Sequence, residues 1–200
     1  MKFWTLLICL LTHFFSNAQD TYLDEIKAHR EGINEEFADS ENTILDSADW
    51  VNFNGLEFFE INPEYRVLAK FKKIKKGEII GFSTSTDRIA KYREYGTLTF
   101  KINGEKCKLT VYEPAVFNAQ YPDHLFLPFK DFSNGVSSYG GGRYLDLSKK
   151  DISKKMFVDF NYCYNPYCAY SGNYSCPVPP SCNYLEVEIL AGVKAFGQHH

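Results

Sequence analysis

The clearest hydrophobic pattern in the chain is an alternation of apolar and polar residues on both sides of Asn103-Gly104. A two-residue Asn-Gly loop between alternating segments is typical of a tight β-hairpin. Closing the hairpin there pairs Phe100 with Cys107. Leu98 then lies opposite Leu109 on the same face. The pattern predicts a half-buried hairpin in which Cys107 is a buried core thiol.

Other short apolar runs bounded by turn residues predict further strands. They are residues 56–61, 65–71, 79–83, 125–129, 143–147, 156–160 and 185–190. Ahead of them, residues 20–38 have apolar side chains at helical spacing with charges between, which predicts an amphipathic helix. Successive short strands without alternating helices are typical of an antiparallel barrel or sandwich. We expect one mainly β domain with an N-terminal amphipathic helix and a long irregular Cys/Tyr/Pro loop before the last strand.

The first residues have the pattern of an export signal. Lys2 precedes a short apolar run, and small residues lead up to Ala18 at the spacing that a signal peptidase recognises. We expect cleavage after Ala18, which makes residues 1–18 a signal peptide and residues 19–200 a single periplasmic or secreted domain. The apolar run is too short to span a bilayer comfortably, so we expect no stable membrane insertion after cleavage.

Composition limits the possible partners. Aromatic residues make up 16% of the 200 residues, which favours packing on pleated surfaces. The net charge of −3 gives no electrostatic reason to expect nucleic acid or an anionic membrane. No pattern indicates a cofactor, and the oligomeric state stays open. The partner that we consider is a small-molecule ligand.

Residues 159–182 form a stretch rich in Cys, Tyr and Pro without a helical or strand period. Its cysteines are Cys163, Cys168, Cys176 and Cys182. They lack the close Cys-x-x-Cys pairs typical of structural zinc, so we expect no metal. Export favours disulfides instead, because the compartment is oxidising. Four cysteines allow three pairings, and spacing alone does not choose among them.

Three consecutive glycines, residues 140–142, stand directly before Arg143. Successive glycine N–H groups can form a nest that binds anions, and a guanidinium adds a fork of two donors. The alternative is a glycine-rich entry to a strand, with the arginine in a structural ion pair. Its candidate partners are Asp131, Asp146 and Asp159.

The runs SYGGGRYLDL and DFNYCYNPYCAYSGNYSCPVPPSCNYLEV, with FNGLEFFEINPEYRV upstream, resemble the bacterial and archaeal family known as domain of unknown function 1684. The family pattern falls on Gly142, Arg143, Tyr144, Asp146, Asp159, Phe160, Asn161, Tyr164, Asn165, Pro166, Cys168, Ala169, Tyr170, Tyr174, Cys176, Pro177, Pro179, Pro180 and Asn183. Cys163 and Cys182 lie outside that pattern. The resemblance therefore suggests an added Cys163–Cys182 disulfide that encloses a Cys168–Cys176 pair, and it implies no activity.

Three functions stay open. The first is an exported binding protein for a small anionic or sugar-like ligand, with a pocket where the Gly-Gly-Gly-Arg turn meets the Asn/Tyr/Cys loop. Its candidate ligand-binding residues are Arg143, Asp159, Asn161, Tyr164, Asn165 and Tyr170. The second is a hydrolase with Asp159 or Asp146 as general base and Arg143 as electrostatic stabiliser. The third is a purely structural or interaction module.

Overall fold

The structure is a computed structural model that describes the backbone of residues 2–197 and the side chains of residues 20–197. The chain divides after Thr43 into two units, which we describe separately. The first unit contains the helix α1 (Lys2–Ala38), and the Thr43 hydroxyl donates a hydrogen bond to the Phe37 carbonyl just beyond its end. Within the predicted segment 20–38, Ile26 and Phe37 are buried while most charged side chains are exposed, as expected for an amphipathic helix.

Residues 1–18 are the predicted signal peptide. Their side chains lie outside the described residues, so the signal peptide stays a prediction. Among the residues that are described, no helix has the length and hydropathy of a membrane span.

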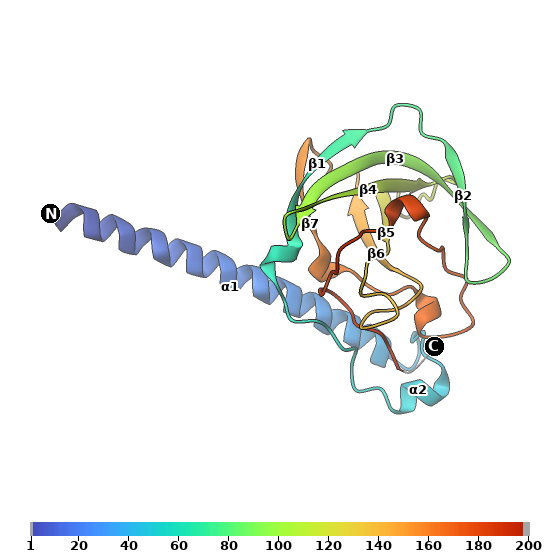
Figure 1. Cartoon of the computed structure of the whole chain (residues 1–200). Helices are drawn as coiled ribbons and strands as arrows, with labels where there is room; N and C mark the ends of the chain where they lie inside the picture. Colours follow the sequence, from blue (N-terminus) through green and yellow to red (C-terminus); the bar gives the residue numbers. More distant parts are fainter. Residues whose placement is uncertain (1, 198–200) are drawn as a thin grey trace. The chain divides into compact units, whose positions relative to one another are not determined.

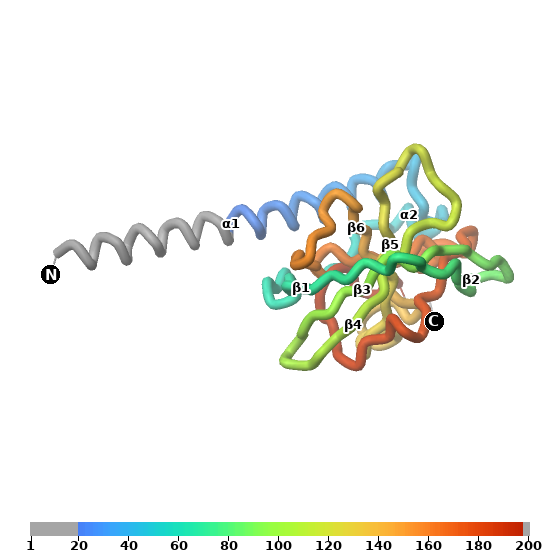
Figure 2. The backbone as a smooth tube through the Cα atoms, turned by 90° about the horizontal axis from the view of Figure 1, so that it is seen from above, coloured from blue at the N-terminus to red at the C-terminus, as the bar shows by residue number. Residues whose placement is uncertain are grey.

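The second unit is built on a seven-stranded sheet that curls into a half-barrel, shown from two directions in Figures 1 and 2. The strands are β1 (Arg66–Lys73), β2 (Ile79–Ser83), β3 (Ile89–Ile102), β4 (Glu105–Pro114), β5 (His124–Phe129), β6 (Arg143–Ser148) and β7 (Lys155–Asp159). All paired strands are antiparallel, in the order β6-β5-β4-β3-β1-β7, with β2 also paired to β3. The expected mainly β, antiparallel architecture is confirmed.

Short helices connect the strands and shape the long loop. They are α2 (Ser47–Val51) and the 3₁₀ helices η1 (Pro63–Tyr65), η2 (Phe160–Tyr162), η3 (Tyr167–Ala169) and η4 (Ser181–Asn183). The predicted turn around Pro63 is therefore the start of η1, and the Asn62 side chain accepts a hydrogen bond from the Glu64 N–H there.

The β3–β4 hairpin has the predicted register. Phe100 pairs with Cys107 and Leu98 with Leu109. Asn103 and Gly104 have φ angles of 51° and 86°, the left-handed values that a two-residue hairpin loop requires and that Asn and Gly tolerate best. Cys107 is 5% exposed, as predicted for a core thiol.

β3 turns the sheet, because its first half pairs with β2 and its second half with β1. Between the halves the pairing with β4 shifts at a bulge between Glu94 and Gly96. A Cβ on Gly96 would lie 2.3 Å from the Phe71 ring, so only glycine lets that ring lie against the backbone. A bulge bends a strand and increases its twist, which helps to curl the sheet.

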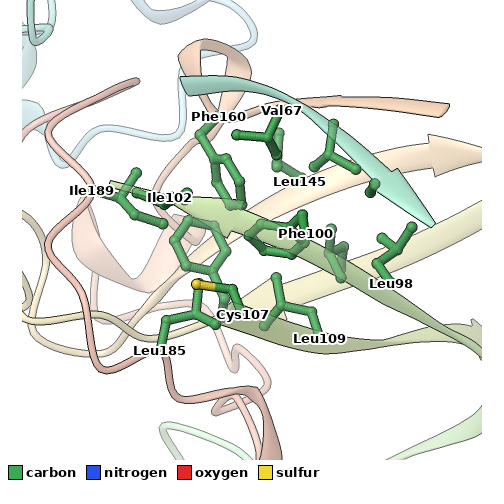
Figure 3. Close-up of a cluster of buried hydrophobic side chains, with 14 of the residues drawn as sticks. Val67, Leu98, Phe100, Ile102, Cys107, Leu109, Leu145, Phe160, Leu185 and Ile189 are labelled. Atoms are coloured by element: carbon green, nitrogen blue, oxygen red, sulfur yellow. The ribbon is translucent and has the colours of Figure 1, made fainter. Parts of the chain in front are cut away.

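The concave face of the sheet holds the main hydrophobic core, part of which is drawn in Figure 3. Leu98, Phe100 and Leu109 contribute from the hairpin, and Phe160 contributes from η2. The C-terminal segment fills the remaining space with alternate side chains, namely Leu185, Val187, Ile189 and Ala191. This segment is thus an internal plug of the half-barrel.

Two predicted strands, residues 56–61 and 185–190, are not strands in the structure. The first forms a single bridge between Phe58 and Val193, and the second lies next to a single parallel bridge between Lys130 and Tyr184. Residues 185–190 have the sequence pattern of a strand because their side chains are alternately buried and exposed. A strand also needs a neighbouring strand for its backbone hydrogen bonds, and a segment that crosses the interior has no continuous one.

The opposite face of the sheet has a second, mostly aromatic hydrophobic cluster, made of Phe82, Ala90, Tyr112, Phe126 and Tyr144. The Cys/Tyr/Pro loop covers part of it. Tyr164 packs edge-on against Tyr144 with ring centroids 5.9 Å apart, and the Tyr144 hydroxyl donates to the Pro177 carbonyl. The loop is therefore a packed layer of the fold.

The core location of the hairpin predicts the effect of a truncation. Leu109→Ala removes a side chain that is 0% exposed, and we expect it to lower the free energy of unfolding by about 2–5 kcal/mol. Lys108→Ala, on the exposed face of the same strand, should change it by less than about 0.5 kcal/mol. Urea unfolding of both variants measures the difference, and equal effects would contradict the assigned faces.

Candidate functional site

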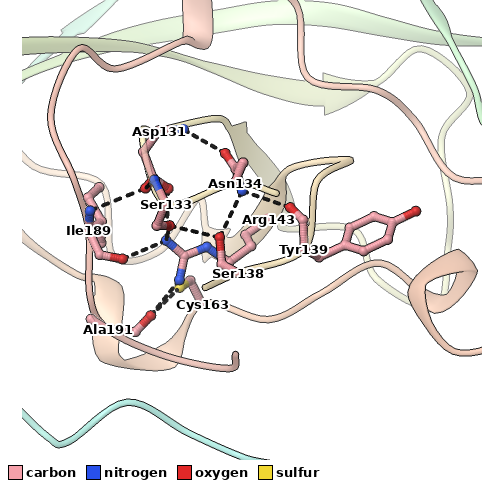
Figure 4. A network of polar contacts seen from close by, with 9 residues as sticks. All are labelled: Asp131, Ser133, Asn134, Ser138, Tyr139, Arg143, Cys163, Ile189 and Ala191. Atoms are coloured by element: carbon pink, nitrogen blue, oxygen red, sulfur yellow. Dashed lines mark hydrogen bonds and ion pairs between the residues drawn. The ribbon is translucent and has the colours of Figure 1, made fainter. Parts of the chain in front are cut away.

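A fully buried ion pair lies at the start of β6, shown in Figure 4. The guanidinium of Arg143 donates from Nη2 to Asp131 Oδ2 at 2.8 Å and to the Ile189 carbonyl at 2.7 Å. Nη1 donates to the Ala191 carbonyl at 2.6 Å. Both side chains of the pair are 0% exposed. The arginine thereby ties β6 to the C-terminal plug.

Asp131 organises the loop that precedes the three glycines. Its Oδ1 accepts from the backbone N–H of Ser133 at 2.8 Å and of Ile189 at 3.2 Å. The loop is closed by Asn134, whose amide donates to the Tyr139 carbonyl at 2.8 Å. Three segments distant in sequence therefore meet at one carboxylate.

This geometry corrects the predicted ligand-binding role of Arg143. The donors on Nη1 and Nη2 serve protein oxygens, and the side chain has no exposed surface, so an incoming anion would have to displace Asp131 inside the core. The alternative considered above, a structural ion pair, is the arrangement found, with Asp131 as the partner.

Asp159 and Asn161 form a structural corner. Asp159 Oδ1 accepts from the backbone N–H of Asn161 at 3.0 Å and from its amide at 2.8 Å. Asn161 in turn holds Asn62 through both backbone groups, at 3.0 and 2.9 Å. These side chains join η2 to the segment before η1, and Asn161 is only 1% exposed.

The remaining predicted ligand-binding residues are also dispersed. Tyr164 donates its hydroxyl to Asp146 Oδ2 at 2.8 Å. Asn165 donates its amide to the Lys194 carbonyl at 2.7 Å. Tyr170 is 3% exposed and packs on Phe196 with ring centroids 5.1 Å apart. The structure does not gather the six predicted residues around one cavity.

The predicted hydrolase pairing is not formed either. Asp146 accepts from His124 Nε2 at 2.7 Å and is half exposed, whereas Arg143 points into the core. Since side chains alternate along a strand, positions 143 and 146 of β6 lie on opposite faces. Asp159 is occupied by Asn161, so neither carboxylate adjoins the guanidinium in the described structure.

A groove of 440 Å³ lies where the glycine turn meets the end of the Cys/Tyr/Pro loop. Its lining residues are Lys130, Asp131, Phe132, Asn134, Gly140, Pro179, Pro180, Ser181 and Tyr184. The place agrees with the predicted junction, but the lining residues differ from those predicted.

The groove combines one available cation with flat apolar walls. Asp131 is neutralised by Arg143 beneath it, which leaves the ammonium of Lys130 as the uncompensated charge among the lining side chains. Phe132 and Tyr184 are about half exposed and meet edge-on, with ring centroids 6.1 Å apart. Among the described residues, no hydrogen bond uses the Lys130 ammonium or the hydroxyls of Ser181 and Tyr184, so these groups are available to a ligand.

Glycine is needed at position 142, where the turn packs against the groove residue Pro179. Gly142 has a φ of 100°, and a Cβ there would lie 2.6 Å from Pro179 and 2.9 Å from the Phe129 carbonyl. Gly142 therefore lets Pro179 pack onto the turn, which is a structural reason for glycine at this position and does not depend on an anion nest. Sequence reasoning passed over Lys130, Phe132 and Tyr184, although aromatic residues at exposed positions beside a Pro-Pro pair were a usable signal.

The four cysteines of the Cys/Tyr/Pro loop divide into an adjacent pair and two separate thiols. The backbone N–H of Cys168 lies 3.1 Å from the Cys176 sulfur, and the two are not bonded. Cys163 donates to the Ala191 carbonyl at 3.3 Å, whereas Cys182 is an exposed thiol beside the Tyr112 hydroxyl. The suggested Cys163–Cys182 disulfide is therefore not formed, because the two sulfurs face different groups. Within the described part of the chain, no three His, Cys, Asp or Glu side chains are placed to hold a metal ion.

Comparisons with known proteins identify a family without an assigned activity. The family model described as "Protein of unknown function (DUF1684)" matches residues 51–194. The chain is also similar to an uncharacterized protein from gene locus rrnAC0354 of Haloarcula marismortui, known from a solution NMR structure. The two are 32% identical over 92% of this chain and 99% of that one, with a TM-score of 0.71. No curated protein matches.

The buried ion pair predicts a large effect of one substitution. Arg143→Met leaves the Asp131 carboxylate buried without its cation, and we expect a loss of about 3–5 kcal/mol in the free energy of unfolding. Adding Asp131→Asn should recover part of that loss, because the uncompensated charge is gone. Denaturant unfolding measures both variants.

Lys150→Met is the matched control, since it breaks an ion pair with Asp123 at the surface. It should leave the free energy of unfolding nearly unchanged. An Arg143→Met variant as stable as this control would refute the structural role of the buried pair.

Proposed function

The chain belongs to the family of proteins of unknown function DUF1684, and we propose that it binds a small anionic, sugar-like ligand in the groove between Lys130 and Tyr184. The observation that carries the proposal is the pairing of one available ammonium with flat apolar walls in a concave site. A volume of 440 Å³ falls within the roughly 300–1,000 Å³ of typical ligand pockets.

Charge favours an anion. The lining contains one carboxylate, Asp131, and its charge is matched by Arg143 from the core side. The Lys130 ammonium is therefore the charge that an incoming ligand meets. A lysine presents three donors from a flexible stem, which suits a carboxylate or sulfate group of variable orientation.

Shape favours a ring. Pro179 and Pro180 form one flat wall, while the half-exposed rings of Phe132 and Tyr184 form another. Apolar walls of this kind suit the C–H face of a pyranose, and the hydroxyls of Ser181 and Tyr184 suit its oxygens. An acidic sugar, such as a uronic acid, satisfies both requirements.

Ligand binding predicts a thermal shift. At a ligand concentration ten times Kd, binding stabilises the native state by about 1.4 kcal/mol. For a domain of this size that corresponds to a rise in Tm of about 3–5 °C. We expect oligogalacturonates or glucuronate to give this shift, and neutral glucose or sodium acetate to give none.

Matched variants assign the shift to the groove. Lys130→Ala should abolish it, and Tyr184→Ala should reduce it at least severalfold. Lys155→Ala, on β7 and outside the groove lining, should retain it. A shift that survives Lys130→Ala would place the ligand elsewhere, and no shift with any acidic sugar would refute the proposal.

Export is part of the same proposal, since a sugar ligand from outside the cell requires it. The support is the signal-like pattern that ends at Ala18. We expect the mature protein to begin at Gln19 when the full chain is expressed in a bacterial host. N-terminal sequencing of the periplasmic or secreted product checks this, and a cytoplasmic product that retains Met1 would contradict it.

A further inference from the structure

Two cysteines of the Cys/Tyr/Pro loop, Cys168 and Cys176, are in contact. Cys168 lies in η3, and its backbone N–H donates to the Cys176 sulfur at 3.1 Å. Cys176 is fixed by the turn after β2, because its N–H donates to Ser85 Oγ at 3.0 Å and its carbonyl accepts from the Ser85 N–H at 2.9 Å. The backbone of Cys168 thus lies against the Cys176 sulfur, and Cys176 is fixed by a different segment, the turn after β2.

The two thiols differ in their environments. Cys168 is partly exposed, while Cys176 is 8% exposed. A hydrogen bond from the Cys176 thiol is the largest cause that lowers the pKa of Cys168, and the Tyr139 hydroxyl, 3.7 Å from its sulfur, acts in the same direction against the opposing effect of burial. The same thiol–thiol contact, followed by burial, raises the pKa of Cys176.

Two phenols and an arginine lie near the pair, and the charge of Arg88 acts to lower the pKa of Cys176. Burial is the largest cause that raises the pKa of Tyr139 and of Tyr144, so both phenols stay protonated and can donate. Arg88 is the cation on this side. It is held by hydrogen bonds to the carbonyl and hydroxyl of Ser175, next to Cys176. The site therefore contains hydrogen-bond donors and one cation around a pair of sulfurs.

We propose that Cys168 and Cys176 form a thiol–disulfide exchange site, in which Cys168 attacks a small-molecule disulfide and Cys176 resolves the product. A partly exposed nucleophile next to a buried partner thiol is the arrangement that such exchange requires. The proposal is independent of the sugar groove, because none of the groove-lining residues is a cysteine.

The exchange is balanced in two steps. The Cys168 thiolate attacks one sulfur of RSSR, a Cys168–SR bond forms, the S–S bond of RSSR breaks, and RS⁻ leaves. Cys176 then loses its proton to solvent or to RS⁻ and attacks the Cys168 sulfur, which releases the second RS⁻. The protein dithiol is oxidised by two electrons to the Cys168–Cys176 disulfide, and RSSR is reduced to two RSH.

A redox titration tests the reaction on the purified protein. The protein is equilibrated in buffers of reduced and oxidised glutathione, quenched with acid, alkylated with a mass tag and mapped by peptide mass spectrometry. We expect Cys168 and Cys176 to lose their tags together in one two-electron transition. Cys176→Ser should instead accumulate glutathione on Cys168, and Cys107→Ser should titrate like the wild type.

Alkylation kinetics separate an exchange site from an inert pair. An ordinary thiol of pKa about 8.5 is only about 3% thiolate at pH 7 and reacts with iodoacetamide correspondingly slowly. We expect Cys168 of the reduced protein to react with iodoacetamide at pH 7 at least tenfold faster than such an ordinary thiol. Tyr139→Phe, which removes one hydroxyl from the ring, should shift the pH midpoint of that reaction upward.

Two outcomes would overturn the proposal. One is a Cys168 that stays reduced, or pairs with Cys163 or Cys182, across the glutathione series. The other is an alkylation midpoint at the ordinary thiol pKa that neither Tyr139→Phe nor Cys176→Ser changes. Failure of the thiol–disulfide exchange proposal would not affect the proposed sugar binding, because sugar binding is tested separately by the Tm of Lys130 variants.

Discussion

The ion pair between Arg143 and Asp131 is the interaction on which the second unit depends. Burying two charges costs several kcal/mol per ion unless the pair has good geometry and further hydrogen bonds. Here the guanidinium also binds the carbonyls of Ile189 and Ala191, and the carboxylate binds two backbone N–H groups. The pair therefore supplies hydrogen bonds to a C-terminal plug that has no ladder of its own. The half-barrel is closed by a side-chain network as well as by its apolar plug.

The segment from Lys130 to Arg143 connects this network to both candidate sites. Lys130, Asp131 and Phe132 all line the groove, and Asp131 is held from the core side by Arg143. Further along, Asn134 holds the Tyr139 carbonyl, and the Tyr139 hydroxyl reaches the Cys168 sulfur. The loop from Lys130 to Arg143 is fixed by the buried carboxylate of Asp131. It thus positions the Lys130 ammonium at the groove and the Tyr139 hydroxyl at the Cys168 sulfur. Asp131 and Asn134, for which we propose no ligand, therefore set the positions of Lys130 and of the Tyr139 hydroxyl.

The sequence was most informative where local chemistry decides the structure. The Asn103-Gly104 turn and the alternation around it predicted the hairpin and its register, since both depend on neighbouring residues. An alternating apolar and polar pattern also predicted a strand at residues 185–190, and this prediction was wrong. Side-chain alternation reports which residues are buried, and it does not report whether the backbone has a partner strand. That partner is set by tertiary contacts, which a single sequence does not display.

The predicted site failed for a related reason. The sequence predicts a pocket of tyrosines with an arginine, an aspartate and asparagines, because ligand sites usually combine apolar walls with a few convergent polar groups. A segment that crosses a core leaves carbonyl and N–H groups that must also be satisfied, and buried polar side chains are the means. Asn183 shows this most directly, since its amide group serves Thr110 and the Pro128 carbonyl from a position that is 0% exposed. In a loop that packs as a layer of the fold, the most polar residues are the most structural ones. The residues to which we assign the two proposed functions, Lys130, Tyr184 and Cys168, are instead ones that the packing leaves at least partly exposed.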